Sequence, residues 1–233
     1  MKYTKGTVGL LITLLIIGIS MDALGFLGFG NSVSWQEEVL LHDGQKIIVK
    51  RHQTLGGKPT LDSRERTTLE EEWIFPVPGT ERKISWKTGF KSPPEGPCLM
   101  LVLVGFPGGI PYIATVAAGC TAYNHWGRPN PPYVFFKYDG ANWQRIPLEE
   151  FPTELKEVNV AVGRPDSSHR TGLLSIATIK GENRNLEIHM RQIVREPVKV
   201  AQTVECEELI FYKGAWIGPG DSIGKRMMDR KSK

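Results

Sequence analysis

"SWQEEVLLHDGQKIIVKRH", residues 34–52, places two β-prone runs on either side of Asp43-Gly44. Asp-Gly is a favoured two-residue loop of an antiparallel hairpin. Pairing the runs around this loop predicts three cross-strand pairs: Trp35 opposite His52, Glu37 opposite Lys50 and Val39 opposite Ile48. These side chains are compatible neighbours across a ladder, so the stretch predicts an antiparallel hairpin.

Four further stretches repeat the pattern of two β-prone runs around a turn. They are LEEEWIFPVPGTERKISW (69–86), CLMLVLVGFPGGIPYIATVA (98–117), YVFFKYDGANWQRI (133–146) and ELIFYKGAWIG (208–218). The last is centred on Lys213-Gly214, which brings Phe211 opposite Trp216. The run CLMLVLV is apolar throughout, which predicts a strand buried on both faces.

The remaining segments hold little helix. EVNVAVG (157–163) and NLEIHMRQIVRE (185–196) alternate as strands do. PLEEFPTELKE (147–157) allows one or two helical turns, and SSHRTGLLSIATIKGE (167–182) allows a short helix opened by a serine cap. We therefore expect a mainly β fold of about ten to twelve short strands with one or two short helices. An antiparallel sandwich and an irregular barrel built from hairpins both fit this pattern.

Formal charge lies at the two ends of the chain rather than on its body. The 233 residues carry a net charge of +4, and the tail from Gly224 holds five basic residues and one acid. The body, residues 31–223, is therefore close to neutral, which argues against a basic face for nucleic acid. We expect a single β-rich domain over 31–223 and a basic disordered tail over 224–233. A weak electrostatic contact between the tail and an anionic lipid or polymer is the alternative.

The first thirty residues resemble an export signal. Lys2 and Lys5 precede an uncharged apolar run from Gly6 to Met21, which Asp22 closes. Residues 1–30 are therefore a signal peptide or a membrane anchor, and the body is expected in the periplasm. We expect an inner-membrane anchor over residues 6–29; cleavage, at the small-x-small pattern Ala23-Leu24-Gly25 or Gly18-Ile19-Ser20, is the alternative. A buried core helix is a third reading, which the lysine flank disfavours.

If the chain is exported, two of its three cysteines can form a disulfide, because an oxidising compartment permits one. Cys98 opens an apolar run, whereas Cys120 and Cys206 lie in polar, turn-like surroundings. The predicted bridge is Cys120–Cys206, and Cys98 is then a buried free thiol. The spacing of the three fits no zinc pattern, so we expect no metal site.

The stretch NHWGRPNPPY (124–133) has two readings. Its three prolines fix the backbone, which favours a stiff polyproline-like strut that leads into the next hairpin, with Arg128 stacked on Trp126 or Tyr133. The second reading is a rigid, aromatic partner-binding face, because preorganised Trp, Tyr and Arg make good hot spots. The candidate binding residues are His125, Trp126, Arg128, Tyr133 and Trp143.

Signals for catalysis are weak. Cys120 and His125 are present but would have to act from one loop, and a disulfide would remove the thiolate. Asp166, Ser167, Ser168 and His169 are adjacent on one turn, so they cannot line up for proton transfer. A solvated loop explains them. Paired glutamates at 37–38, 70–72, 149–150 and 207–208 leave a glycosidase pair possible only if folding brings two carboxylates together. We expect no catalytic residue and no cofactor.

Three stretches carry a resemblance to a known group of proteins. SWQEEVLLHDGQKIIV, WGRPNPPYVFFKYDG and REPV…C…YKGAWIG resemble a group of uncharacterised, chiefly proteobacterial proteins with an N-terminal membrane or signal segment. The resemblance covers residues 34–218 and implies a setting in the bacterial envelope but no activity. The sequence thus predicts an exported, non-catalytic binding or structural module that engages an envelope protein through the aromatic Pro-rich loop. The alternative is a cell-wall or glycan hydrolase that uses carboxylates from separate strands.

Overall fold

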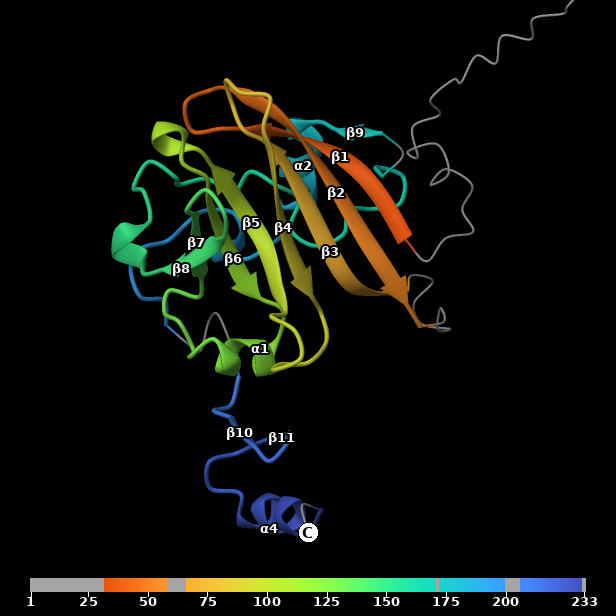
Figure 1. Cartoon of the computed structure of the whole chain (residues 1–233), viewed down its shortest axis with the longest axis vertical. Coiled ribbons are helices and arrows are strands. Elements are labelled where there is room, and N and C mark those ends of the chain that lie inside the picture. Colours follow the sequence, from red (N-terminus) through yellow and green to blue (C-terminus); the bar gives the residue numbers. More distant parts are fainter. Residues whose placement is uncertain (1–31, 58–65, 171, 200–205, 232–233) are drawn as a thin grey trace, which may run out of the picture. The chain divides into compact units, whose positions relative to one another are not determined.

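The computed structural model describes residues 32–57, 66–170, 172–199 and 206–231 (Figure 1). The predicted signal or anchor over residues 1–30 lies outside these residues. Within them, antiparallel sheets of hairpins dominate, as the sequence predicts, and the sheets do not close into a barrel. The eleven strands among the described residues fall within the predicted range.

The larger sheet is assembled from the two N-terminal hairpins. Its order is β4-β3-β2-β1-β9, and the strands are β1 (Ser32–Leu40), β2 (Lys46–Gly56), β3 (Thr67–Pro76), β4 (Lys83–Gly89) and β9 (Leu173–Leu174). Neighbouring strands are antiparallel except β9, which pairs in parallel with β1. Side chains alternate along β2 between buried and exposed, so one face of the sheet is turned to the interior.

The predicted register of the first hairpin is wrong by one residue. Trp35 lies opposite Arg51, Glu37 opposite Val49 and Val39 opposite Ile47. The reason is the loop, which has three residues, 42–44, rather than two. The Leu41 amide donates to the Gln45 carbonyl at 2.8 Å, and Gly44, the last residue of the loop, has φ +85°. A three-residue loop with its last residue in the left-handed region is the next common hairpin connection. A shift of one residue changes which side chains meet across the strands.

The second sheet contains β5 (Leu99–Gly105), β6 (Tyr112–Ala117), β7 (Val134–Tyr138) and β8 (Trp143–Ile146), in that order. Both hairpins were predicted from the sequence. A bulge between Leu101 and Leu103 turns the side chains of β5 so that Leu101 and Val104 join one core and Val102 and Leu103 the other. The apolar run is therefore buried on both faces, as predicted.

The main core lies between the two sheets. Trp73, Phe75 and Trp86 from the larger sheet pack with Leu101 and Ile113 from the smaller one in a single cluster. A second cluster covers the other face of the smaller sheet, where Phe151, Leu155 and Ile193 come from irregular segments. The smaller sheet is thus enclosed, whereas the outer face of the larger sheet is solvent-exposed.

Three short α-helices are present among the described residues, one more than the highest expected number. They are α1 (Cys120–His125), α2 (Ile176–Glu182) and α4 (Ser222–Lys231), and three 3-10 turns accompany them: η2 (Pro107–Gly109), η3 (Leu148–Glu150) and η4 (Ile188–Met190). The helix expected over residues 167–182 forms only in the second half of that range, where the Ser175 hydroxyl caps α2 and accepts from the Thr178 amide at 3.2 Å. Helix α4 occupies most of the segment predicted to be a disordered tail. Asp221 explains its start, because its carboxylate accepts from the Gly224 amide at 2.8 Å.

Residues 157–163 and 185–196 were predicted as strands, but the first segment is irregular and the second contains η4. An isolated bridge between Glu157 and Gln192 joins them. Their backbone groups find other partners. The Asn159 amide donates to the Val102 carbonyl at 3.3 Å, and the Ala161 amide donates to the Glu37 carboxylate at 2.9 Å. These bonds to an edge strand and a buried side chain replace a regular ladder.

A last hairpin follows Cys206 and consists of β10 (Ile210–Tyr212) and β11 (Ala215–Ile217). It has the predicted pair, Phe211 opposite Trp216.

Candidate functional site

The predicted disulfide between Cys120 and Cys206 is present. The two sulfurs are bonded, and the bridge closes a separation of 86 residues. Cys98 is a buried free thiol, also as predicted, and burial raises its pKa. A disulfide is typical of an oxidising compartment. It also removes Cys120 as a nucleophile, so the Cys120–His125 arrangement has no catalytic thiolate.

The two tryptophans of the predicted binding face are half-buried and hydrogen-bonded to the body. The indole of Trp126 donates to the Pro97 carbonyl at 2.8 Å, and that of Trp143 donates to the Ser85 carbonyl at 2.7 Å. Both rings pack against the main core, where Trp143 meets Phe75 edge-on. Trp143 on β8 thereby joins the smaller sheet to β4 of the larger one, and Trp126 joins the end of α1 to the segment before β5.

Arg128 fastens the C-terminal segment to the body. Its guanidinium donates to the Glu207 carbonyl at 3.0 Å and the Cys206 carbonyl at 2.9 Å, and it lies over the ring of Tyr123. The predicted stacking partners, Trp126 and Tyr133, are therefore wrong. Residue 128 lies beside Tyr123 because the chain turns back after α1, where the Arg128 amide donates to the Tyr123 carbonyl at 2.9 Å.

Tyr133 is buried, with an exposed fraction of 3%. Its hydroxyl donates to a carbonyl of residue 189 or 192 and accepts from the Val194 amide at 3.1 Å. Burial raises its pKa to about 12. Of the five predicted binding residues, only His125 is exposed, with its ring near Trp126 and Trp216. The partner-binding role of this set stays a prediction, but all five members make internal contacts and four of them are buried or half-buried.

Two glutamates from separate strands converge at one point, and that point is buried. Glu37 on β1 and Glu71 on β3 both accept from the guanidinium of Arg51 on β2. Glu37 has an exposed fraction of 0% and Arg51 of 2%. Arg51 is held between the rings of Trp35 and Trp73, at 4.7 and 4.1 Å from their centroids. The cluster stabilises the interior, and a sugar cannot reach these carboxylates.

Burial and the hydrogen-bonding partners of Glu37 shift its pKa in opposite directions. Burial raises the pKa of this carboxyl, and the Arg51 guanidinium opposes that shift, as do the Ala161 amide and the Trp35 indole. The sequence did not predict this cluster because the assumed register placed His52, not Arg51, opposite Trp35.

A second acidic group lies on the outer face of the larger sheet. Glu70 and Glu72 are two residues apart on β3, so their side chains share a face, and they line a shallow hollow of about 380 Å³ with His52 and Lys87. Glu72 pairs with Lys87 at 3.2 Å. The Ser34 hydroxyl oxygen on β1 lies 2.7 Å from Nδ1 of His52. Ser34, His52 and Glu72 are thus neighbours across three strands. They lie on an open sheet whose backbone amides bond to the adjacent strands, so these amides are not available to bind an oxyanion.

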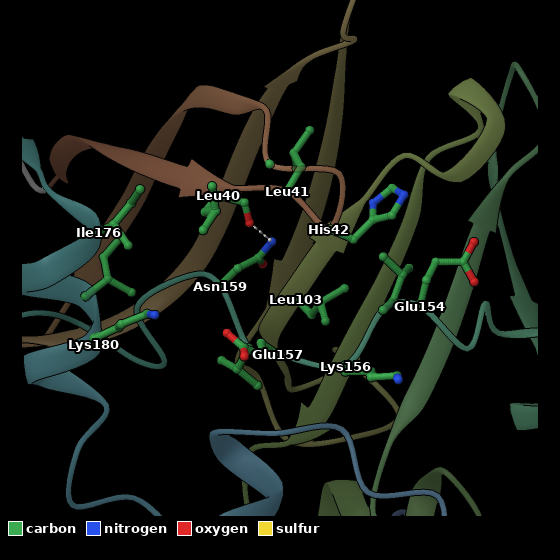
Figure 2. Close-up of a pocket in the computed structure, with 14 residues that line it drawn as sticks. Leu40, Leu41, His42, Leu103, Glu154, Lys156, Glu157, Asn159, Ile176 and Lys180 are labelled. Carbon is green, nitrogen blue, oxygen red and sulfur yellow. Dashed lines mark hydrogen bonds between the residues drawn. The ribbon is translucent and has the colours of Figure 1, made fainter.

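A cleft of about 360 Å³ lies between the two sheets and α2. Four separate segments build it: the β1–β2 turn, β5, residues 154–159 and α2. Figure 2 shows Leu103 of β5 at its centre, between the turn that carries Leu41 and His42 and the segment that carries Lys156 and Glu157. Its volume is in the range of small-ligand and peptide side-chain pockets.

The cleft combines an apolar floor with a charged rim. Leu103, Leu155 and Ile179 form the floor and are almost completely buried. The rim carries both signs of charge, from Glu154, Lys156, Glu157 and Lys180, together with His42. A surface of this kind can hold an apolar side chain below and match charged neighbours above. It offers no nucleophile with a base beside it.

Asn159 fixes the inner wall of the cleft. Its side-chain oxygen accepts from the Val104 amide at 3.0 Å, and its amide nitrogen donates to the Val104 carbonyl at 2.8 Å. The same nitrogen donates to the Leu40 carbonyl at 3.1 Å (Figure 2). One side chain thereby joins β5 to the first hairpin. None of the cleft residues was predicted as functional, because four segments far apart in the sequence build it.

Further comparisons give no functional precedent. The chain has no match among models of protein families, curated proteins or solved structures. In the described part of the chain, no cluster of three or more His, Cys, Asp or Glu is arranged to bind a metal ion. None of the described helices is both long and apolar enough to cross a bilayer.

Proposed function

We propose that this chain is an exported, non-catalytic binding module of the bacterial envelope, and that it engages a protein partner at the cleft shown in Figure 2. The apolar floor and the two-signed rim carry the proposal, because they offer a buried anchor point and charges that select a partner. A basic apolar N-terminus and a disulfide support export to the periplasm. An inner-membrane anchor over residues 6–29 is the form of attachment that we favour.

The contact residues of this proposal differ from those expected from the sequence. Trp126, Arg128, Tyr133 and Trp143 hold the fold together, so replacing them would perturb stability and binding at once. Lys156 and Lys180 are exposed on the cleft rim. They can therefore be changed with little effect on the fold.

Site-specific photocrosslinking in the native host tests the proposal. A photoreactive residue at position 156 or 180 of the tagged, full-length chain should capture one dominant protein. The same residue at Lys83 or Lys91, which are exposed elsewhere on the body, should not. Lys156→Glu with Lys180→Glu should abolish capture by a probe at position 42, whereas Lys83→Glu with Lys91→Glu should leave it unchanged. Equal capture from both sets of positions would contradict the cleft as the binding site.

A hydrolase is the second candidate, and the outer-face hollow is the observation in its favour. Two residues along a strand separate Glu70 and Glu72 by roughly 6.6 Å between Cα atoms, a spacing compatible with glycosidase carboxylates. Purified protein should then cleave cell-wall fragments or glycans, and Glu70→Gln or Glu72→Gln should lower the rate by several orders of magnitude. Equal traces of cleavage by the wild type and both variants would rule out this pair.

A further inference from the structure

The C-terminal segment is held to the body at its beginning. The disulfide joins Cys206 to α1, and the Asn124 side chain accepts from the Leu209 amide at 2.8 Å. Further along, the Trp216 indole donates to the Pro93 carbonyl at 2.7 Å. These contacts place the β10–β11 hairpin against a defined part of the fold.

The hairpin in turn orients helix α4. The Tyr212 hydroxyl and the Lys213 ammonium both donate to the Asp229 carboxylate, at 2.9 and 2.6 Å. Lys225 reaches back to the Pro219 carbonyl at 2.7 Å. The side of α4 that carries residues 225 and 229 is thus occupied by internal contacts, and the helix cannot present that side to a partner.

The opposite side of α4 is exposed and has a consistent composition. Ile223 and Met227 are four residues apart, as are Arg226 and Arg230, so the two pairs form adjacent rows along one face, with Lys231 next to them. Ile223 is 63% exposed and Met227 56%. They are the two most exposed of the large hydrophobic residues in the described part of the chain. We call this face, Ile223, Arg226, Met227, Arg230 and Lys231, the outer face of α4.

The charges on the outer face select the occupant. Its three basic residues have no acidic neighbour on the same side, because the acid of the helix, Asp229, is bound by the hairpin. A second copy of this face would bring like charges together, which disfavours self-association. A bilayer with anionic headgroups matches instead: apolar side chains enter the interface while arginine and lysine reach the phosphates.

We propose that the outer face of α4 docks on the surface of an anionic phospholipid bilayer. The helix lies in the interfacial plane and does not span the bilayer, because it has ten residues and only one apolar pair on that face. This contact is separate from the cleft, so either proposal can fail without the other. It holds the domain close to the membrane by a second attachment.

An environment-sensitive fluorophore on the full-length chain tests the docking locally. Met227→Cys is labelled in the oxidised protein, where Cys120 and Cys206 are bonded and Cys98 is buried. With vesicles of mixed phosphatidylglycerol and phosphatidylcholine, the emission should shift to the blue, and high salt should reverse the shift. Vesicles of phosphatidylcholine alone should give no shift. A label at Leu173→Cys, 52% exposed on β9, is the positional control and should not respond.

Charge reversal separates this contact from any insertion of the N-terminal segment. Arg226→Glu with Arg230→Glu should reduce docking at the label by ~30-fold or more, because each basic residue near an anionic surface contributes about fivefold. Lys83→Glu with Lys91→Glu makes the same change in net charge on the body and should keep the shift. The same shift on both kinds of vesicle, or its survival in the Arg226→Glu, Arg230→Glu variant, would overturn the proposal. An equal response to a lipid-free polyanion would assign the face to a polymer instead.

Discussion

Arg51 on β2 donates to two buried glutamates, one on each flanking strand, while two indole rings cover its guanidinium. Removing the cation would leave Glu37 and Glu71 without their main partner inside the protein. Arg51→Met should therefore lower the free energy of unfolding by about 3–5 kcal/mol, as measured by urea denaturation. Lys50→Met, one residue earlier and facing solvent, is the matched control and should cost far less.

The pH dependence of this loss follows from Glu37. Burial already raises its folded-state pKa above the ordinary 4.5, and without Arg51 the opposing effect of the cation is lost. A carboxyl with a raised folded pKa binds more protons in the folded state, so its stabilising effect is present below 4.5 and is lost as pH rises through the folded pKa. Arg51→Met should thus lose more stability at pH about 8 than at pH about 5. An equal loss at both values would show that Glu37 does not take up the proton.

The buried hydroxyl of Tyr133 also contributes to the stability of the fold. Its hydroxyl accepts the Val194 amide in a buried site, and phenylalanine would leave that amide without an acceptor. Tyr133→Phe should cost about 1–3 kcal/mol in chemical denaturation. Tyr138 lies five residues further along the chain, and its ring is half-buried. Tyr138→Phe should change the free energy of unfolding by no more than about 0.5 kcal/mol. Similar small losses in both variants would contradict the structural role given to Tyr133.

Residue types alone do not reveal these roles. Trp126, Tyr133 and Trp143 have the composition of a binding face, yet their polar atoms bond to backbone groups of distant segments. The sequence shows that an aromatic side chain is present but not which carbonyl lies beside it. Cysteine was more predictable, because the apolar run after Cys98 and the polar surroundings of Cys120 and Cys206 separate a core thiol from a bridge.

Among the elements, the hairpins were the most predictable part of the fold. Each depends on a short turn between adjacent β-prone runs, and all five form where the sequence places them. Register was less predictable, because Asp43-Gly44 fits both a two-residue loop and the end of a three-residue loop. Residues 157–163 and 185–196 were not predictable in this way. Polar and apolar residues do alternate in them, but their backbone groups bond to side chains and to an edge strand supplied by other segments.

The first turn can be tested with one substitution. Gly44 has φ +85°, in the left-handed region, and nothing lies within 4 Å of a Cβ built there. Gly44→Ala should therefore cost about 1–2 kcal/mol from backbone conformation alone, measured as a shift in the urea midpoint. Gly181→Ala in helix α2, also without neighbours at that position, should instead stabilise by about 0.5–1 kcal/mol. Equal effects of the two changes would contradict this explanation of the loop.

For the whole molecule, the disulfide decides how the C-terminal segment is attached. Cys120→Ser with Cys206→Ser should leave the two-sheet body folded, because its core clusters do not include either residue. It should increase amide hydrogen exchange in β10, β11 and α4. The wild type, denatured without reductant, should titrate one free thiol. Three thiols, or unchanged exchange in the double variant, would contradict this attachment.

The cleft depends on the tertiary arrangement of the whole body. A turn, a strand, an irregular segment and a helix separated by up to 140 positions meet in the cleft, from Leu40 to Lys180. Sequence periodicity reports which face of an element is apolar, but not which elements face each other. Fold class was therefore accessible from the sequence, whereas the cleft required the tertiary arrangement.

Asn159 blocks main-chain pairing along the edge of β5 that borders the cleft. It satisfies the Val102 carbonyl and both backbone groups of Val104, which are the outward groups of an edge strand. A visiting peptide cannot add itself to β5 there by main-chain hydrogen bonds. The partner proposed for the cleft would therefore be recognised through its side chains, and the direction of its backbone would lose importance. Retro-inverso peptides and non-peptidic mimics with the same anchor and charges should compete for this cleft.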